Sequence, residues 1–202
     1  MAIDLSRKNE LLWVKQGRVF HATHGALTTP VAFQTDLVRQ TPDLMVRVPS
    51  GIVIVPLRVS VAAEGTSVAG VWQCLISACN NDPGIANVTA FIPVNVNSRY
   101  STTGSKVTAY ITATGDTGTA PTGVSDLFRA YVQPRIDNVG TGSAPFEQVV
   151  YAPLWGYGAP SVVGSDTSTN AFMVYVGSGA TTPTGYILAA WAEFTYAEFY
   201  AA

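Results

Sequence analysis

The chain offers few side chains that are suited to metal binding. Its two histidines, His21 and His24, lie three residues apart in the run HATH, and its two cysteines, Cys74 and Cys79, are far from them in sequence. Zinc sites take four ligands or three and a water, and positions three apart on a strand point to opposite faces. We therefore predict no metal site and no cofactor, and we expect both histidines to be partly exposed.

The cysteine spacing also argues against a disulfide. Positions five apart on a strand face opposite sides, and at about 3.3 Å per residue they lie roughly 16 Å apart, which is beyond the reach of an S–S bond. Cys74 and Cys79 are thus predicted to be buried free thiols. Free thiols favour assembly in a reducing cytoplasm.

Nucleophilic and carboxylate chemistry find little support. A triad needs a histidine base, and both histidines lie within the first 27 residues. The motif Gly-x-Ser-x-Gly is absent, and 177–179 (GSG) is interpreted as a turn. Glu193 lies among aromatic residues and is the best candidate for a glycosidase carboxylate. The simpler interpretation is a carboxylate at the end of a strand that faces either solvent or an arginine across an interface. We predict that the chain is not an enzyme.

Aromatic residues gather in the run VVYAPLWGYGAP, which holds Tyr151, Trp155 and Tyr157. Such a set can form a platform for a sugar ring, and it can equally pack against another subunit, since Trp and Tyr are enriched at interfaces. We favour the interface. The same interpretation extends to the aromatic residues of the final stretch GYILAAWAEFTYAEFYAA, namely Trp191, Phe194 and Tyr196.

The charge content bounds the function. Asp, Glu, Lys and Arg make up only 12% of the 202 residues, against about 25% in typical soluble domains. So few charged side chains suit a subunit whose surface is shared with other subunits. The net charge is −2 and there is no basic tract, so strong direct nucleic-acid binding is not expected.

The backbone pattern predicts an all-β protein. Short runs rich in β-branched residues alternate with turns rich in Gly, Pro, Asn and Ser, which gives about eight to ten short strands of an antiparallel β-sandwich or barrel. The strongest run is 52–63, IVIVPLRVSVAA, in which Pro56 marks a sheet edge or a bulge. The run 126–133, DLFRAYVQ, suits either a strand or a short helix.

The final stretch is predicted to be a closing strand, because aromatic and β-preferring residues alternate along it. A helix is the alternative, since four alanines lie between 189 and 197. Residues 1–27 are interpreted as an N-terminal extension or arm, and 28–202 as one β-sandwich domain. We see no signal peptide in MAIDLSRKNELLWVKQ and expect no membrane span, because no run approaches about 18 apolar residues.

The whole pattern resembles that of viral jelly-roll capsid proteins. The likeness covers residues 28 to 200: strands of sandwich type, long polar loops such as TGDTGTAPTG and SVVGSDTSTN, and the final pair AFMVYVGSG and GYILAAWAEFTYAEF. No short motif defines this family. Subunits that package RNA directly often carry a strongly basic arm, and this chain lacks one, so any genome contact would be indirect.

The resemblance implies a jelly-roll-like sandwich and a structural role, as a self-assembling capsid subunit of an icosahedral virus or phage. Its partners would be copies of itself and other virion proteins, and its place would be the virion, assembled in the host cytoplasm. A carbohydrate-binding β-sandwich, such as a spike or receptor-binding module, is the alternative. A subunit of a non-viral extracellular filament is a third reading, disfavoured by the missing signal peptide.

Overall fold

The computed structural model describes residues 7–26, 28–34, 36–64, 72–81, 88–112, 120–132, 147–177 and 184–200. Its helices are α1 (Arg7–Lys15), η1 (Ser98–Tyr100), η2 (Pro153–Trp155) and α2 (Tyr196–Tyr200). Its longer strands are β1 (Val19–His24), β3 (Leu44–Val48), β4 (Ile52–Glu64), β5 (Trp72–Cys79), β9 (Val124–Val132), β10 (Glu147–Tyr151), β12 (Asn170–Gly177) and β13 (Thr184–Thr195). Shorter strands are β2 (Val31–Ala32), β6 (Val88–Phe91), β7 (Val94–Asn95), β8 (Thr108–Thr112) and β11 (Val163–Ser165).

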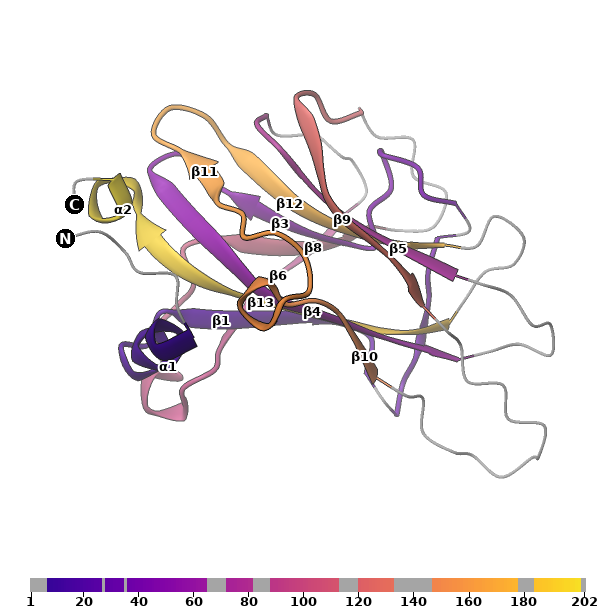
Figure 1. Cartoon of the computed structure of the whole chain (residues 1–202), viewed down its shortest axis with the longest axis horizontal. Coiled ribbons are helices and arrows are strands. Elements are labelled where there is room, and N and C mark those ends of the chain that lie inside the picture. Colours follow the sequence, from indigo (N-terminus) through magenta and orange to yellow (C-terminus); the bar gives the residue numbers. More distant parts are fainter. Residues whose placement is uncertain are drawn as a thin grey trace.

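The strands form two antiparallel sheets that face each other as a sandwich (Figure 1). The first sheet has the order β10-β4-β13-β1-β7, with β11 on β4 and β2 on β13. The second has the order β6-β8-β3-β12-β5-β9. The all-β sandwich predicted from the sequence is therefore confirmed. For the run 126–133 the strand alternative is correct over 126–132, which belongs to β9, and residue 133 lies outside the described residues.

The pairing of the longer strands is nested, as a jelly roll requires. In chain order they are β1, β3, β4, β5, β9, β10, β12 and β13. The first pairs with the last, β3 with β12, β4 with β10 and β5 with β9. The chain thus behaves like one long hairpin that is rolled up into two four-stranded sheets. The short strands β7, β8 and β6, which follow β5, widen both sheets at the side of β1 and β3.

A bulge in β4 explains why this strand is apolar on both faces. Its register with β13 shifts between Ala190, opposite Arg58, and Trp191, opposite Pro56, so that Leu57 is the extra residue. Before the bulge Ile54 points between the sheets, and after it Val59 does. Proline cannot donate a ladder hydrogen bond, so Pro56 was predicted to mark a sheet edge or a bulge. Because β4 is an inner strand, the bulge is the option that forms.

The sandwich begins earlier in the chain than residue 28. Strand β1 lies between β13 and β7 in the first sheet, although residues 1–27 were expected to form an extension. Helix α1 packs on the outer face of that sheet, where the ring of Trp13 meets the ring of Phe194 edge-on at 5.3 Å between centroids. The period-2 pattern VFHATH, with its buried Phe20 and Ala22, is what builds β1 into the core.

The described residues form three apolar clusters that hold the fold together. The largest fills the space between the sheets and includes Trp72, Tyr151 and Trp191. A second covers the outer face of the second sheet around Met173. The third lies under α1 on the outer face of the first sheet. Both sheets therefore bury apolar residues on both faces. Apolar side chains on the outer faces, which would be exposed in a sandwich of two bare sheets, are covered within the chain.

The last described residues, 184–200, form a strand followed by one helical turn. Strand β13 is central in the first sheet, between β4 and β1, and it ends at Thr195. The backbone N–H of Glu198 donates to Thr195 Oγ1, and the N–H of Thr195 donates to the Glu198 carboxylate. This reciprocal pair is a capping box that starts α2. The predicted closing strand is confirmed for 184–195.

Candidate assembly surface

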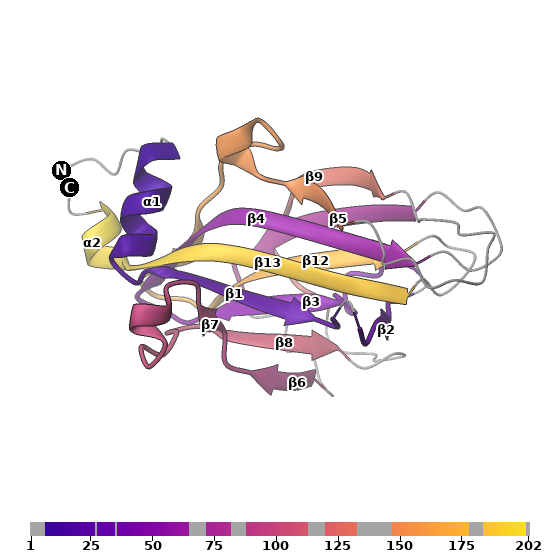
Figure 2. The same ribbon diagram turned by 90° about the horizontal axis from the view of Figure 1, so that it is seen from below.

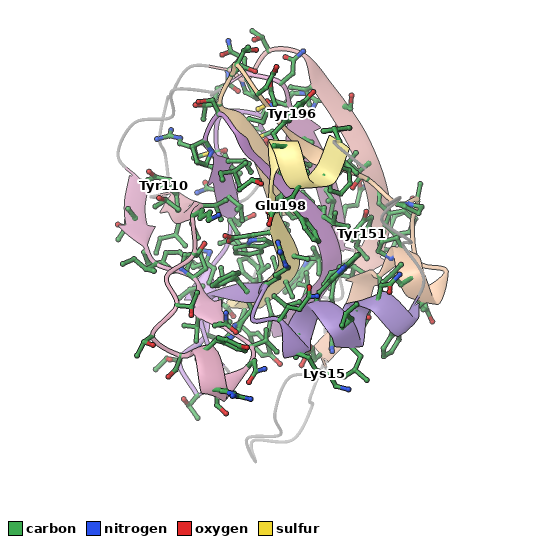
Figure 3. All side chains as sticks on the ribbon, turned by 90° about the vertical axis from the view of Figure 1, so that its left-hand side faces the viewer. Lys15, Tyr110, Tyr151, Tyr196 and Glu198 are labelled. Atoms are coloured by element: carbon green, nitrogen blue, oxygen red, sulfur yellow. The ribbon has the colours of Figure 1, made fainter. Side chains whose placement is uncertain are left out.

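The five residues predicted for an interface fall into three groups by burial. The side chains of Trp191 and Phe194 are only 1% and 5% exposed, on opposite faces of β13. They belong to the core of the chain and have almost no exposed area, so they leave the candidate interface. Tyr196, on α2 (Figure 3), is half-buried. Trp155 and Tyr157 are 55% and 52% exposed.

Trp155 and Tyr157 project from a loop, residues 152–161, that we call the aromatic loop. It follows β10 at one edge of the first sheet and closes on itself, since Ala152 and Tyr157 exchange two backbone hydrogen bonds of 2.8 and 3.1 Å. Leu154 packs into the apolar cluster under α1. The loop therefore holds one aliphatic side chain inward and presents its two aromatic side chains outward.

The aromatic loop is built on the buried ring of Tyr151. The hydroxyl of Tyr151 donates to Ala159 O at 2.8 Å and lies 2.9 Å from Ser161 Oγ. Gly158, at φ 91°, lies so close that a Cβ there would come within 2.7 Å of the Tyr151 ring. Tyr151 thus supports the loop from below and is not part of a three-ring surface platform.

Gly158→Ala is expected to destabilise the protein by about 3 kcal/mol, because it adds backbone strain to a steric clash with Tyr151. Gly156 is the matched control: it has a similar φ of 86°, but a Cβ there would meet open space. Gly156→Ala should cost about 1 kcal/mol from backbone strain alone. Urea unfolding curves of both variants measure the difference, and equal losses would contradict the role given to Tyr151.

A second apolar surface lies at the opposite edge of the first sheet. Ile92, Val94 and Val96 are 75%, 57% and 45% exposed and form what we call the aliphatic ridge. Of the residues that alternate with them, Asn95 is buried and Asn97 is half-buried. Because Val94 lies opposite His21 and Asn95 opposite Phe20, the valine is on the outer face of the sheet and the asparagine on the core side. On an edge strand the apolar side chains usually face the core and the polar ones face solvent, and here the valine is outside and the asparagine inside.

The two asparagines fix the ridge to the turn between α1 and β1. Asn95 Nδ2 donates to Gly17 O at 2.7 Å, and Asn97 Nδ2 donates to Val14 O at 2.9 Å. Asn95 Oδ1 also accepts the backbone N–H of Asn97 at 2.9 Å. The asparagines thus supply donors to one carbonyl of the last turn of α1 and to one carbonyl of the turn that follows it, and the aliphatic side chains of the ridge are left on the outside.

Helix α1 lies between the two surfaces. Seen from the end of the molecule, it runs between the segment with β7 and η1 on one side and the loop after β10 on the other (Figure 3). It exposes Leu11 and Leu12, at 59% and 47%. In the view from below, the same three pieces surround one end of the first sheet (Figure 2). One end of this outer face is therefore bordered by apolar groups.

Glu193 has a structural environment that the sequence did not indicate. It is 5% exposed, and it accepts hydrogen bonds from Ser105 Oγ at 2.5 Å, from Lys106 N at 2.9 Å and from Trp191 Nε1 at 3.0 Å. Burial raises its pKa, and the three donors oppose that rise. The solvent-facing carboxylate expected at this position is wrong. The carboxylate fastens the segment before β8 to the closing strand.

The histidines and cysteines provide no metal site in the described part of the chain. No three residues among His, Cys, Asp and Glu are grouped there so as to hold a metal ion. His24 is buried while His21 is half-buried on the other face of β1, and burial lowers the pKa of both. Cys74 and Cys79 are buried free thiols on opposite faces of β5, as predicted. Residues 178 and 179 of the GSG turn lie outside the described residues.

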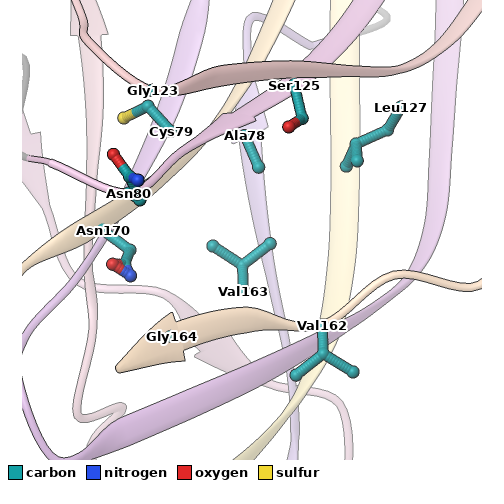
Figure 4. A pocket seen from close by; sticks show the side chains of 10 residues that line it. All are labelled: Ala78, Cys79, Asn80, Gly123, Ser125, Leu127, Val162, Val163, Gly164 and Asn170. Carbon is teal, nitrogen blue, oxygen red and sulfur yellow. The ribbon is translucent and has the colours of Figure 1, made fainter. Parts of the chain in front are cut away.

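A cavity of about 310 Å³ opens beside β5, β9 and β11 (Figure 4). Its polar lining consists of amide and hydroxyl groups from Asn80, Ser125 and Asn170, together with the thiol of Cys79. That thiol donates to Asn81 O at 2.8 Å. Among the residues that line the cavity there is no charged side chain and no histidine, and the Cys79 thiol is its one titratable group.

None of the helices in the described ranges is both long enough and apolar enough to cross a membrane. Comparisons with models of known protein families, with curated proteins and with solved structures gave no match to this chain.

Proposed function

We propose that the chain is a structural virion protein, a jelly-roll subunit that self-assembles into the shell of an icosahedral virus or phage. The observation that carries the proposal is the pair of exposed apolar surfaces, the aromatic loop and the aliphatic ridge, at opposite edges of one rigid sheet. Each is held in place by the subunit's own hydrogen bonds. The role is mechanical and requires no catalysis and no cofactor.

The driving force would be burial of apolar area between copies, at about 25 cal/mol per Å² removed from water. Many such contacts in a closed shell add up by multivalency, even where each is weak. With a net charge of −2, the subunit would meet a nucleic acid genome through other virion proteins. Assembly in the host cytoplasm agrees with the two free thiols.

The first test is the mass of the purified chain by light scattering, with negative-stain electron microscopy of the same sample. We expect closed particles, sheets or regular multimers. The double variant Trp155→Ala with Tyr157→Ala should lose them. Tyr131→Ala is the matched control, since Tyr131 is 74% exposed on β9 in the other sheet. A monodisperse wild-type monomer, or a double variant that assembles normally, would count against the proposal.

A carbohydrate-binding module remains the second candidate, because an exposed Trp and Tyr on one loop can stack on a sugar ring. The burial of Tyr151 reduces the expected platform from three rings to two. A glycan array separates the two functions: saturable sugar binding by a monomer, abolished in the same double variant, would favour this candidate over the shell subunit.

A further inference from the structure

The two apolar surfaces differ in chemistry and lie at opposite edges of the same sheet. Strands β10 and β7 are the two ends of the order β10-β4-β13-β1-β7. The aromatic loop follows β10, and the aliphatic ridge contains β7. Both are on the outer-face side, since Leu154 packs into the cluster under α1 and Val94 shares the side of His21. Figure 2 shows this outer face toward the viewer, with the loop after β10 above and β7 below.

We propose that the aliphatic ridge of one copy packs against the aromatic loop of the next copy, in a head-to-tail contact. The inference rests on the proposed function, because it specifies how self-assembling subunits meet. A contact between two different surfaces is heterologous, and repeated around an axis it closes into a ring. Successive copies then sit side by side with their outer faces on the same side, as subunits in a shell wall must.

The chemistry of the two surfaces suits this contact. Neither 92–96 (IPVNV) nor 152–161 (APLWGYGAPS) contains a charged residue, so no charge loses its hydration when they meet. Branched aliphatic side chains pack well on the flat faces of Trp and Tyr rings, and aromatic side chains are enriched at the centres of interfaces where charged ones are depleted.

The exposed area is sufficient for the centre of an interface. From the exposed fractions of their residues, the ridge and the aromatic loop each expose roughly 300 Å², whereas a standard interface buries about 800 Å² per partner. The remainder would come from the polar rim that surrounds such a centre.

Both surfaces are already ordered within the free subunit. The ridge is fixed by Asn95 and Asn97, and the aromatic loop by Tyr151, Gly158 and Leu154. A contact between preorganised surfaces loses little conformational entropy on binding. This is the reason to choose these two surfaces over the single exposed residues elsewhere, such as Val38 and Val162.

The test uses one variant that breaks each surface. The ridge variant carries Val94→Lys and Val96→Lys, and the loop variant carries Trp155→Lys and Tyr157→Lys. Each alone should stay at the 21.3 kDa mass of one chain. Mixed in equal amounts, they should form a species of twice that mass and nothing larger, because only the intact loop of the first and the intact ridge of the second can meet. Circular dichroism and urea unfolding confirm that both variants fold.

A milder pair of variants covers the case in which lysine prevents folding. Val94→Cys in one copy and Tyr157→Cys in another should form a mixed disulfide on mild oxidation, and this should exceed either self-linked product severalfold, since Cys74 and Cys79 are buried. Dominant Val94→Cys self-linking would mean a two-fold contact and overturn the inference while leaving self-assembly intact. If the wild type assembles but the mixed lysine variants give no dimer, the inference is likewise overturned while self-assembly stands. A wild-type chain that stays monomeric overturns the inference and the proposed function together.

Discussion

Replacing Trp191 by Ala is expected to lower the free energy of unfolding by about 3–5 kcal/mol. The indole is 1% exposed in the cluster between the two sheets, on the central strand β13. Its removal leaves a cavity that strands paired on both sides of β13 cannot close. It also takes away the Nε1–H that Glu193 accepts at 3.0 Å, so a buried carboxylate loses one of its three donors.

Two control variants separate these effects. Trp191→Phe keeps most of the volume and removes the Nε1–H, so it should cost about 1–3 kcal/mol. Trp155→Ala removes the same side chain from an exposed position and should change stability by about 0.5 kcal/mol or less. Chemical denaturation followed by fluorescence measures all three variants.

The comparison also tests the assignment of each tryptophan. Trp191 acts within the subunit, whereas Trp155 is proposed to act between subunits. A Trp191→Ala variant with wild-type stability and lost assembly would reverse that assignment, and so would a Trp155→Ala variant that unfolds easily.

The strand pattern of this chain was predictable because it depends on local chemistry. Runs of β-branched residues bounded by Gly, Pro and Asn indicate strands wherever they occur. A proline within such a run, such as Pro56, fits only at a sheet edge or at a bulge. The nested pairing that makes the fold a jelly roll is a property of contacts far apart in sequence. The N-terminal strand shows the limit: nothing local in VFHATH says that it pairs with β13, more than 160 residues later.

The inner face of β13 could not be identified from polarity alone. Tyr186, Leu188 and Ala190 form the more uniformly apolar face, yet Ile187, Ala189 and Trp191 point between the sheets. The inward face ends in Glu193, whose carboxylate is satisfied by Ser105 and Lys106 from a distant segment. Because the partners of this buried carboxyl group lie far away in the sequence, alternation along β13 does not identify the face that points to the core.

One signal for the end of β13 was present in the sequence. Thr195 and Glu198 have the spacing of a capping box, which marks a helix start and therefore the end of the strand. Arg18 adds an ion pair to Glu198, with 3.0 Å between Nη2 and Oε1. Its hydrogen bond, with those from Thr195, lowers the pKa of Glu198 to about 2. Arg18 comes from the other end of the chain, so only the local half of this arrangement was predictable.

The low charge content has a source within the chain itself, besides the proposed contact with other copies. Part of it was ascribed to a surface shared with other subunits. The structure shows another part within the subunit, because clusters around Met173 and around Phe194 cover the outer faces of both sheets. Composition cannot distinguish an outer face covered by the chain's own segments from one covered by a neighbour. The apolar residues that remain exposed, at the ridge and the aromatic loop, are the ones that bear on assembly.

The stability of the protein is expected to fall as the pH rises from about 4 to about 7, through the ionisation of Asp43. This side chain is 1% exposed, and its carboxylate accepts the backbone N–H groups of Gln34 at 2.8 Å and Val176 at 2.6 Å. It thus ties the segment before β3 to the end of β12. Burial raises its pKa from 3.8 to about 7, and the hydrogen bonds from Val176 and Gln34 oppose that rise.

The direction follows from proton linkage. A raised pKa means that the folded state keeps the Asp43 proton over a pH range in which the unfolded chain has lost it. The associated stability is present in full below about pH 4, declines up to about pH 7 and is absent above it, with a total change of up to about 4 kcal/mol. His24, beside Asp43, acts oppositely: burial lowers its pKa, so its contribution is lost as the pH falls below 6.5.

Asp43→Asn isolates the contribution of Asp43. The amide has one oxygen for two N–H donors, so the variant should be less stable than the wild type at pH 4. It cannot ionise, however, so the gap should narrow steadily toward pH 7 while the His24 contribution stays common to both proteins. Urea unfolding at half-unit pH steps measures the two curves. Parallel curves between pH 4 and 7 would show that Asp43 is ionised throughout and that its two backbone donors outweigh its burial.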